Sequence, residues 1–216
     1  MQPKAQEEMR LLASALRRGG LGVVYLPSQT YGSLVFAAEH ASLQHVRFAL
    51  RHGSGILIVS VRPERLRQLD LPLIHSHHSR SPAFTASVDA ASGTATGISA
   101  SDRLATIRAL ADPASTRDDL TRPGHVFPIR YRAQWDSHAA DTASYLSSKS
   151  GRNATGVSTA IMDDAGDVLD LEGAVLFSRR YELPFWASPD FSVAAAAETK
   201  CRNELVHAAV NIPYGY

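Results

Sequence analysis

Histidine is the side chain of this protein best suited to chemistry near neutral pH, and nine histidines occur among the 216 residues. His125 lies in the strand-like segment "GHVFPIRYR", residues 124–132. Its imidazole could give or take a proton during a reaction, because imidazole groups titrate near neutral pH. It could equally be a structural histidine, held by hydrogen bonds within its own strand.

Three further histidines lie close together in "HSHHSRSP", namely His75, His77 and His78. Such a cluster suggests zinc, but a structural zinc site takes about four ligands at characteristic spacings. The chain has one cysteine, Cys201, and no second ligand cluster at such a spacing. We therefore interpret this segment as a solvated loop.

The elements that would position such residues alternate along the chain. Short apolar runs predict buried strands, and apolar residues at intervals of three or four predict helices. Strands are expected at 21–26, 33–38, 55–61, 83–89, 124–132 and 155–162, with Pro128 interrupting the fifth. Helices are expected at 9–18, 42–53, from 63 onward, at 101–111, 138–148 and 171–181, with Ser42 and either Ser99 or Ser101 as caps. This alternation favours an α/β domain.

Composition excludes several classes of partner. The formal net charge is +1 and no run of lysine and arginine occurs, so we expect no nucleic-acid binding. The N-terminal segment mixes charges into its apolar positions, which argues against a signal peptide or a membrane span. A single cysteine excludes an internal disulfide. We therefore expect a cytoplasmic protein that acts on a small molecule.

Six segments together are specific enough to indicate a family: "GSLVFAAEHAS", "LRQLDLPLI", "AFTASVDA", "TGISASDRLATIRALADPA", "DDLTRPGHVFPIR" and "GVSTAIMDDAGD". In this order and spacing they resemble 3,4-dihydroxy-2-butanone-4-phosphate synthase, which converts ribulose 5-phosphate into formate and the four-carbon unit of riboflavin. The resemblance implies a single α/β domain with a mixed sheet and surrounding helices, and a homodimer. We expect this domain over residues 1–188, and a C-terminal extension, 189–216, packed on the domain or across the dimer.

The acidic, metal-binding loop of that family has no counterpart here. The corresponding segment reads "PSQTYGSL", and no acidic residue occurs between Leu26 and Glu39. On the resemblance, Gln29 replaces the metal-ligating glutamate, Tyr31 a second glutamate, and Ser33 a substrate-binding aspartate.

The second half of the family's site has changed as well. Trp135 replaces a phosphate-binding arginine, Ala160 a catalytic glutamate and Ile58 an active-site cysteine. His138 is retained, either as a polar pocket residue or as the exposed start of a helix. His125 matches a histidine that the family needs for catalysis, and we predict it as the catalytic acid or base.

The residues expected to contact substrate lie in or beside these motifs: Gln29, Tyr31, Ser33, Thr96, Ser99, Asp102, Arg103, Trp135 and His138. Asp102 and Arg103 could equally cap and brace the helix that they begin, since an acidic residue is favourable in a first helical turn. The replacements make the expected pocket less charged and more aromatic, as in sites for apolar ligands.

These losses predict a site without metal or cofactor, because Mg²⁺ prefers carboxylate and other oxygen ligands. The leading hypothesis is a metal-independent enzyme that acts by acid/base chemistry on a less charged, apolar or aromatic molecule in specialised metabolism. Two alternatives remain open. The chain could be a genuine riboflavin-pathway synthase with a rearranged loop, or a non-catalytic family member that binds a ligand or a partner.

Overall fold

The computed structural model describes residues 3–74, 82–132, 138–148 and 155–188. The strands in this part of the chain are β1 (Gly22–Tyr25), β2 (Gly32–Ala37), β3 (Leu57–Val61), β4 (Val88–Ala90), β5 (Leu120–Arg130), β6 (Gly156–Ala160) and β7 (Phe185–Ala187). The helices are α1 (Pro3–Arg17), α2 (Leu43–His52), α3 (Pro63–Gln68), α4 (Ala100–Ala111), α5 (Ala139–Ser148) and α6 (Leu171–Arg180).

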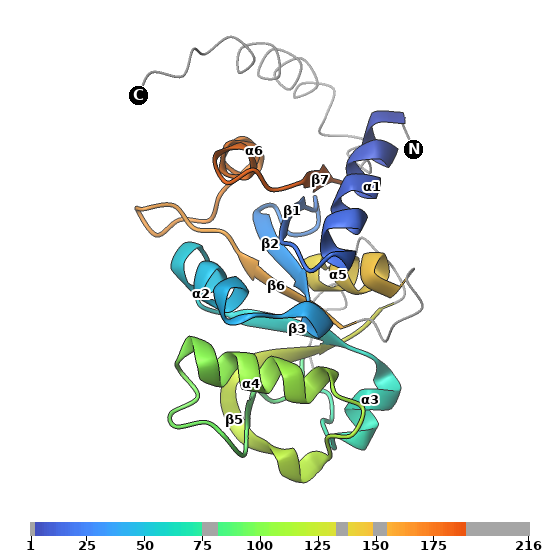
Figure 1. The fold of residues 1–216 in the computed structure, drawn as a ribbon, viewed down its shortest axis with the longest axis vertical. Helices are drawn as coiled ribbons and strands as arrows, with labels where there is room; N and C mark the ends of the chain where they lie inside the picture. The colour runs from blue at the N-terminus through green and yellow to red at the C-terminus, as the bar shows by residue number, and fades with distance from the viewer. Residues whose placement is uncertain (1–2, 75–81, 133–137, 149–154, 189–216) are drawn as a thin grey trace.

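These strands form one mixed sheet in the order β4-β5-β3-β6-β2-β1-β7 (Figure 1). β1 pairs in parallel with β7, and β3 pairs in parallel with β5. The remaining neighbours pair antiparallel. The mixed sheet with surrounding helices confirms the predicted α/β architecture.

Helices cover both faces of this sheet. α1 and α5 cover one face, where Leu12 and Trp186 belong to a fully buried cluster. α2, α4 and α6 cover the other face, over a larger core that includes Ile107. Successive residues of a strand point to opposite faces, and Val23 and Val24 accordingly belong to different clusters.

Three helices begin at side-chain caps, of which those at Ser42 and Ser99 were predicted and that at Asp170 was not. Side-chain oxygens of Ser42, Ser99 and Asp170 each accept the backbone N–H three residues later, at 3.2, 3.1 and 2.8 Å. Such a cap satisfies one of the N–H groups that have no partner inside the helix. For α4, Ser99 rather than Ser101 is the cap.

Two expectations about strands were wrong in part. Within 83–89, only the end joins a strand, β4, while Phe84 and Thr85 form isolated bridges. Pro128 does not interrupt β5, which continues to Arg130. The missing N–H of Pro128 is tolerated because its carbonyl still accepts a hydrogen bond from Thr85 at 3.0 Å.

The histidine-rich segment 75–81 and the extension 189–216 lie outside the described residues, so the expectations about them stay predictions. Among the helices that the structure describes, none has the length and apolar character needed to cross a bilayer.

Candidate active site

Asp89 holds His125 through two hydrogen bonds. The backbone N–H of His125 donates to Oδ1 of Asp89 at 2.9 Å, and the ring Nδ1 lies 2.8 Å from Oδ2. Asp89 is buried, whereas the His125 side chain is 39% exposed. An ionised carboxylate can only accept, so the neutral ring carries its proton on Nδ1 and its lone pair on Nε2. This arrangement suits a general base that a carboxylate orients.

The loop before α4 closes over this pair. Gly97 has a φ of +77°, and a Cβ at this position would lie 2.0 Å from Oδ2 of Asp89 and 2.7 Å from Nδ1 of His125. Glycine is therefore required here, both for the backbone conformation and for the close approach. The Gly97 N–H donates to Oδ2 of the buried Asp102 at 3.0 Å, so Asp102 fixes the loop that covers the pair.

The remaining predicted residues of this segment hold the loop and the start of α4. Arg103 donates through Nε to the carbonyl of Ile98 at 3.0 Å, and through Nη1 to the carbonyl of Gly55. Thr96 and Ser99 are exposed. For Asp102 and Arg103 the geometry supports the bracing role, and their contact with a substrate stays a prediction.

A second group of predicted residues meets at the start of α5. The side-chain Oε1 of Gln29 accepts the backbone N–H of Ala139 at 2.8 Å, and its Nε2 donates to the Tyr31 hydroxyl at 2.9 Å. Ala139 is the first residue of α5, so its N–H has no partner within the helix. Gln29 therefore caps α5 from a distant segment, and both the oxygen and the nitrogen of its amide are hydrogen-bonded to protein groups.

His138 precedes α5 and is only 4% exposed. Burial, with a smaller contribution from the charge of Arg132, lowers the pKa of His138 to about 4. The ring is therefore neutral at pH 7. Its Nδ1 lies 3.2 Å from the backbone nitrogen of Ala140, which can only donate, so the ring proton resides on Nε2.

The sheet brings both groups to the same end. One row across the sheet contains Phe127 on β5, Ile58 on β3, Ser158 on β6 and Val35 on β2. His125 and Ser33 each precede a member of this row by two residues, and β2 and β5 point in the same direction. Three strand spacings separate them, which places their backbones about 14 Å apart. Ser33 is buried and lies opposite Ala160. At this separation, the residues around His125 and those at the start of α5 lie at the same end of the sheet but do not touch each other.

Buried hydrogen bonds also tie α5 to the sheet. Ser60 on β3 donates to the carboxylate of Asp141, and both residues are almost fully buried. The N–H of Gly156 on β6 donates to the Ser144 hydroxyl at 2.7 Å. These two hydrogen bonds therefore hold α5, and with it the preceding His138, against the sheet.

Sequence reasoning predicted a role for His125 but did not include its hydrogen-bond partner, Asp89. The available signal was an aspartate at the end of the apolar, strand-like "AFTASVD", because a buried carboxylate needs a partner. It also missed the caps that Gln29 and Asp102 provide, since both depend on contacts between distant segments. Trp135 lies outside the described residues, so its predicted place opposite Tyr31 stays a prediction.

Comparison with known proteins identifies the scaffold. A model of the 3,4-dihydroxy-2-butanone 4-phosphate synthase family matches residues 12–191. The chain belongs to this family. Curated relatives of that name from Yersinia pestis and Yersinia pseudotuberculosis are 36% identical over 192 residues, which cover 85% of this chain and 88% of theirs.

Solved structures agree with this assignment. A 3,4-dihydroxy-2-butanone 4-phosphate synthase in complex with two magnesium ions matches with a TM-score of 0.77 and 32% identity, over 88% of this chain and 96% of the other. The Candida albicans synthase matches with a TM-score of 0.73 and 29% identity, over 83% of this chain and 92% of the other. The predicted fold and family are thus confirmed.

The relative described above binds two magnesium ions. The residues at the corresponding place in this chain do not fit Mg²⁺. Gln29 is neutral, and both ends of its amide bind protein groups. His138 carries its proton on Nε2, and moving it to Nδ1 would oppose the N–H of Ala140. Mg²⁺ prefers carboxylate oxygens. Within the described ranges, no three histidine, cysteine or acidic residues group as metal ligands.

Proposed function

We propose that this chain is a metal-independent enzyme on the synthase scaffold that moves protons on a small, less charged, apolar or aromatic molecule in specialised metabolism. The observation that carries the proposal is the neutral bridge from Gln29 to Ala139 and Tyr31. It occupies the position at which the resemblance expects a metal-binding glutamate. The ordered Asp89–His125 pair supplies the acid/base group.

In this proposal His125 takes a proton from the substrate on Nε2. The resulting imidazolium keeps both hydrogen bonds to Asp89, whose negative charge stabilises it. The proton then returns to the product, so that no redox partner is needed. Gly97 closes the loop over the pair and restricts the motion of the ring.

Neutral hydrogen-bonding groups dominate the second half of the proposed site. The Tyr31 hydroxyl accepts from Gln29 and can still donate its own proton to a ligand oxygen. His138, neutral at pH 7, offers an N–H rather than a charge. Such groups favour a neutral ligand over a sugar phosphate, which needs charge-assisted contacts.

Hydrogen–deuterium exchange tests the proposal without knowledge of the full reaction. A panel of apolar and aromatic carbonyl compounds would be incubated with the enzyme in D₂O, and loss of acidic C–H signals followed by NMR. We expect exchange that chelators do not affect, that His125→Ala abolishes, and that Asp89→Asn slows. His40→Gln, in the turn between β2 and α2 and outside the candidate active site, is the matched control. Exchange that persists in His125→Ala would refute the assignment.

A second candidate is the family reaction itself, which the 36% identity to curated synthases favours. Formate release from ribulose 5-phosphate, with Mg²⁺ or Mn²⁺, separates the two. We expect none, whereas turnover on the order of 1 s⁻¹ or faster would establish a genuine synthase. Absence of both activities would favour a non-catalytic, ligand-binding member.

The proposal includes a cytoplasmic homodimer. Family membership supports the dimer, since the motif segments 96–103 and 122–128 are both present in this chain. Light scattering at micromolar concentration would check it, and the monomer mass of 23.3 kDa would count against it.

A further inference from the structure

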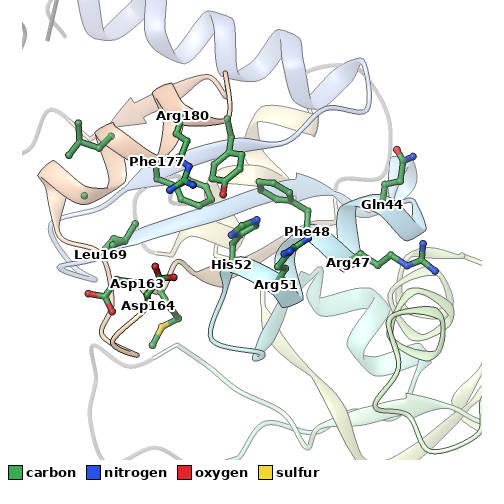
Figure 2. A pocket seen from close by; sticks show the side chains of 14 residues that line it. Gln44, Arg47, Phe48, Arg51, His52, Asp163, Asp164, Leu169, Phe177 and Arg180 are labelled. Carbon is green, nitrogen blue, oxygen red and sulfur yellow. The ribbon is translucent and has the colours of Figure 1, made fainter. Parts of the chain in front are cut away.

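A cavity of about 870 Å³ opens between α2, α6 and the turn at 162–169 (Figure 2). α2 and α6 pack on the face of the sheet opposite α5, and the lining does not include His125, Gln29 or Tyr31. The volume falls within the range of small-molecule sites. This cavity is therefore separate from the candidate active site.

One wall of the cavity is aromatic. The His52 ring lies 4.5 Å from that of Phe48, 4.8 Å from that of Tyr181 and 5.6 Å from that of Phe177, measured between centroids. Phe177 is buried, whereas the other three rings are half-buried and reach the cavity. A flat ring bound here would find stacking and edge contacts already arranged.

Arginines line the same cavity. Arg47, Arg51 and Arg180 are exposed, and none of them belongs to a salt bridge within the described part of the chain. The guanidinium carbon of Arg180 lies 5.6 Å from the centroid of the Tyr181 ring. Positive charge thus adjoins the aromatic wall.

Two aspartates, Asp163 and Asp164, also line the cavity (Figure 2). Asp163 uses its Oδ1 to accept the backbone N–H groups of Ala165 and Asp167, at 2.9 and 2.8 Å. Its carboxylate is therefore engaged in holding the turn. Asp164 is exposed, and its negative charge opposes that of the arginines at the His52 ring.

The charges of two arginines affect the pKa of His52. Burial is the main cause that lowers the pKa of His52, and the charges of Arg51 and Arg180 lower it further, against a smaller opposing effect of Asp164. Both guanidinium groups therefore lie within electrostatic reach of one ring. A bound anion beside this ring would be attracted by both charges.

We propose that this cavity binds a small planar aromatic anion, a ring that bears a carboxylate or phosphate. The ring packs against Phe48 and Tyr181, and the acidic group lies between Arg51 and Arg180. The three arginines form no salt bridge with any residue that the structure describes, and together with the aromatic wall they select for both properties.

Phenyl phosphate is the probe, titrated into the full-length protein by calorimetry, with inorganic phosphate and benzyl alcohol for comparison. We expect phenyl phosphate to bind at least about 10-fold more tightly than either. Arg51→Gln and Arg180→Gln should each weaken it about 10-fold, since each removes a charge-assisted contact. The matched control is Arg179→Gln, the neighbouring exposed arginine outside the lining, which should change the affinity less than about twofold.

Several results would overturn the proposal. If inorganic phosphate binds as tightly as phenyl phosphate, the arginines attract anions without any selection for an aromatic ring. If Arg180→Gln leaves phenyl phosphate binding intact and Gln29→Ala abolishes it, the ligand binds in the candidate active site and not in this cavity. Leu176 lines the cavity and is 53% exposed, so a dimer that Leu176→Glu dissociates would show this face to be a subunit interface.

Discussion

Replacement of His138 tests whether this ring is buried in its neutral form. The pKa of His138 is about 4 in the folded chain, against about 6.5 for an unfolded chain. The unfolded state therefore binds the proton more tightly. The contribution to stability is complete above pH 6.5 and is lost as the pH falls from 6.5 towards 4.

The size of the effect follows from the two values. A difference of about 2.5 pH units corresponds to at most about 3.4 kcal/mol, of which about 2 kcal/mol is lost by pH 5. His45 and His52 also have lowered pKa values, chiefly from burial, and add to the acid sensitivity of the wild type. They contribute equally to a His138→Gln variant, so the difference between the two proteins isolates His138.

The assay is urea unfolding of both proteins at pH 7.5 and at pH 5. His138→Gln can be less stable than the wild type at both values, because a buried ring is replaced. Its loss of stability between pH 7.5 and 5 should nevertheless be about 2 kcal/mol smaller. Equal losses would show that His138 is not buried as a neutral ring, and the argument against a metal at His138 would lose its support.

Three further substitutions test the contacts around the site. Gly97→Ala would place a methyl group against Asp89. It should lower the free energy of unfolding by about 1–3 kcal/mol and should also slow the proton exchange proposed for His125. Unchanged urea midpoints would contradict this. Gln29→Glu should keep the cap of α5, with stability within about 0.5 kcal/mol. Calorimetry should still detect no Mg²⁺ binding, because His138 offers the ion no lone pair. Submillimolar affinity would show that the neutral side chain at position 29 alone excludes the ion. Asp141→Ala leaves the buried Ser60 hydroxyl without its acceptor and should cost about 1–3 kcal/mol by the same urea assay; a neutral result would show that water replaces the carboxylate.

Much of the fold could be predicted because its signals are local. The cap at Ser42 and the apolar spacing after it determine α2 without reference to any other segment. The run at 21–26 similarly predicts β1. Pro128 was misjudged because its tolerance depends on Thr85, which lies far away in sequence and is adjacent only in the sheet.

The site was harder to predict, since its contacts join distant segments. Asp89 and His125 are 36 residues apart, and Gln29 and Ala139 are 110 residues apart. Composition could show that the acidic loop is missing. It could not show that an amide from this loop would bind the first N–H of α5. The cavity between α2 and α6 has the same origin, because its arginines come from two helices that only the fold brings together.

Protein contacts support the start of α5 beside a loop that contains no acidic residue between Leu26 and Glu39. On the resemblance, a glutamate at position 29 and His138 would together hold a metal between the loop before β2 and the start of α5. Here one hydrogen bond, from the N–H of Ala139 to Gln29, spans these segments, and the Ser60–Asp141 contact fixes the same first turn of the helix to the sheet. Both contacts are made by groups of the chain itself, so they link the loop, the helix and the sheet directly. In the proposed function, these contacts would order the site before substrate arrives, and the Tyr31 hydroxyl and the neutral His138 would suit a molecule that carries no phosphate.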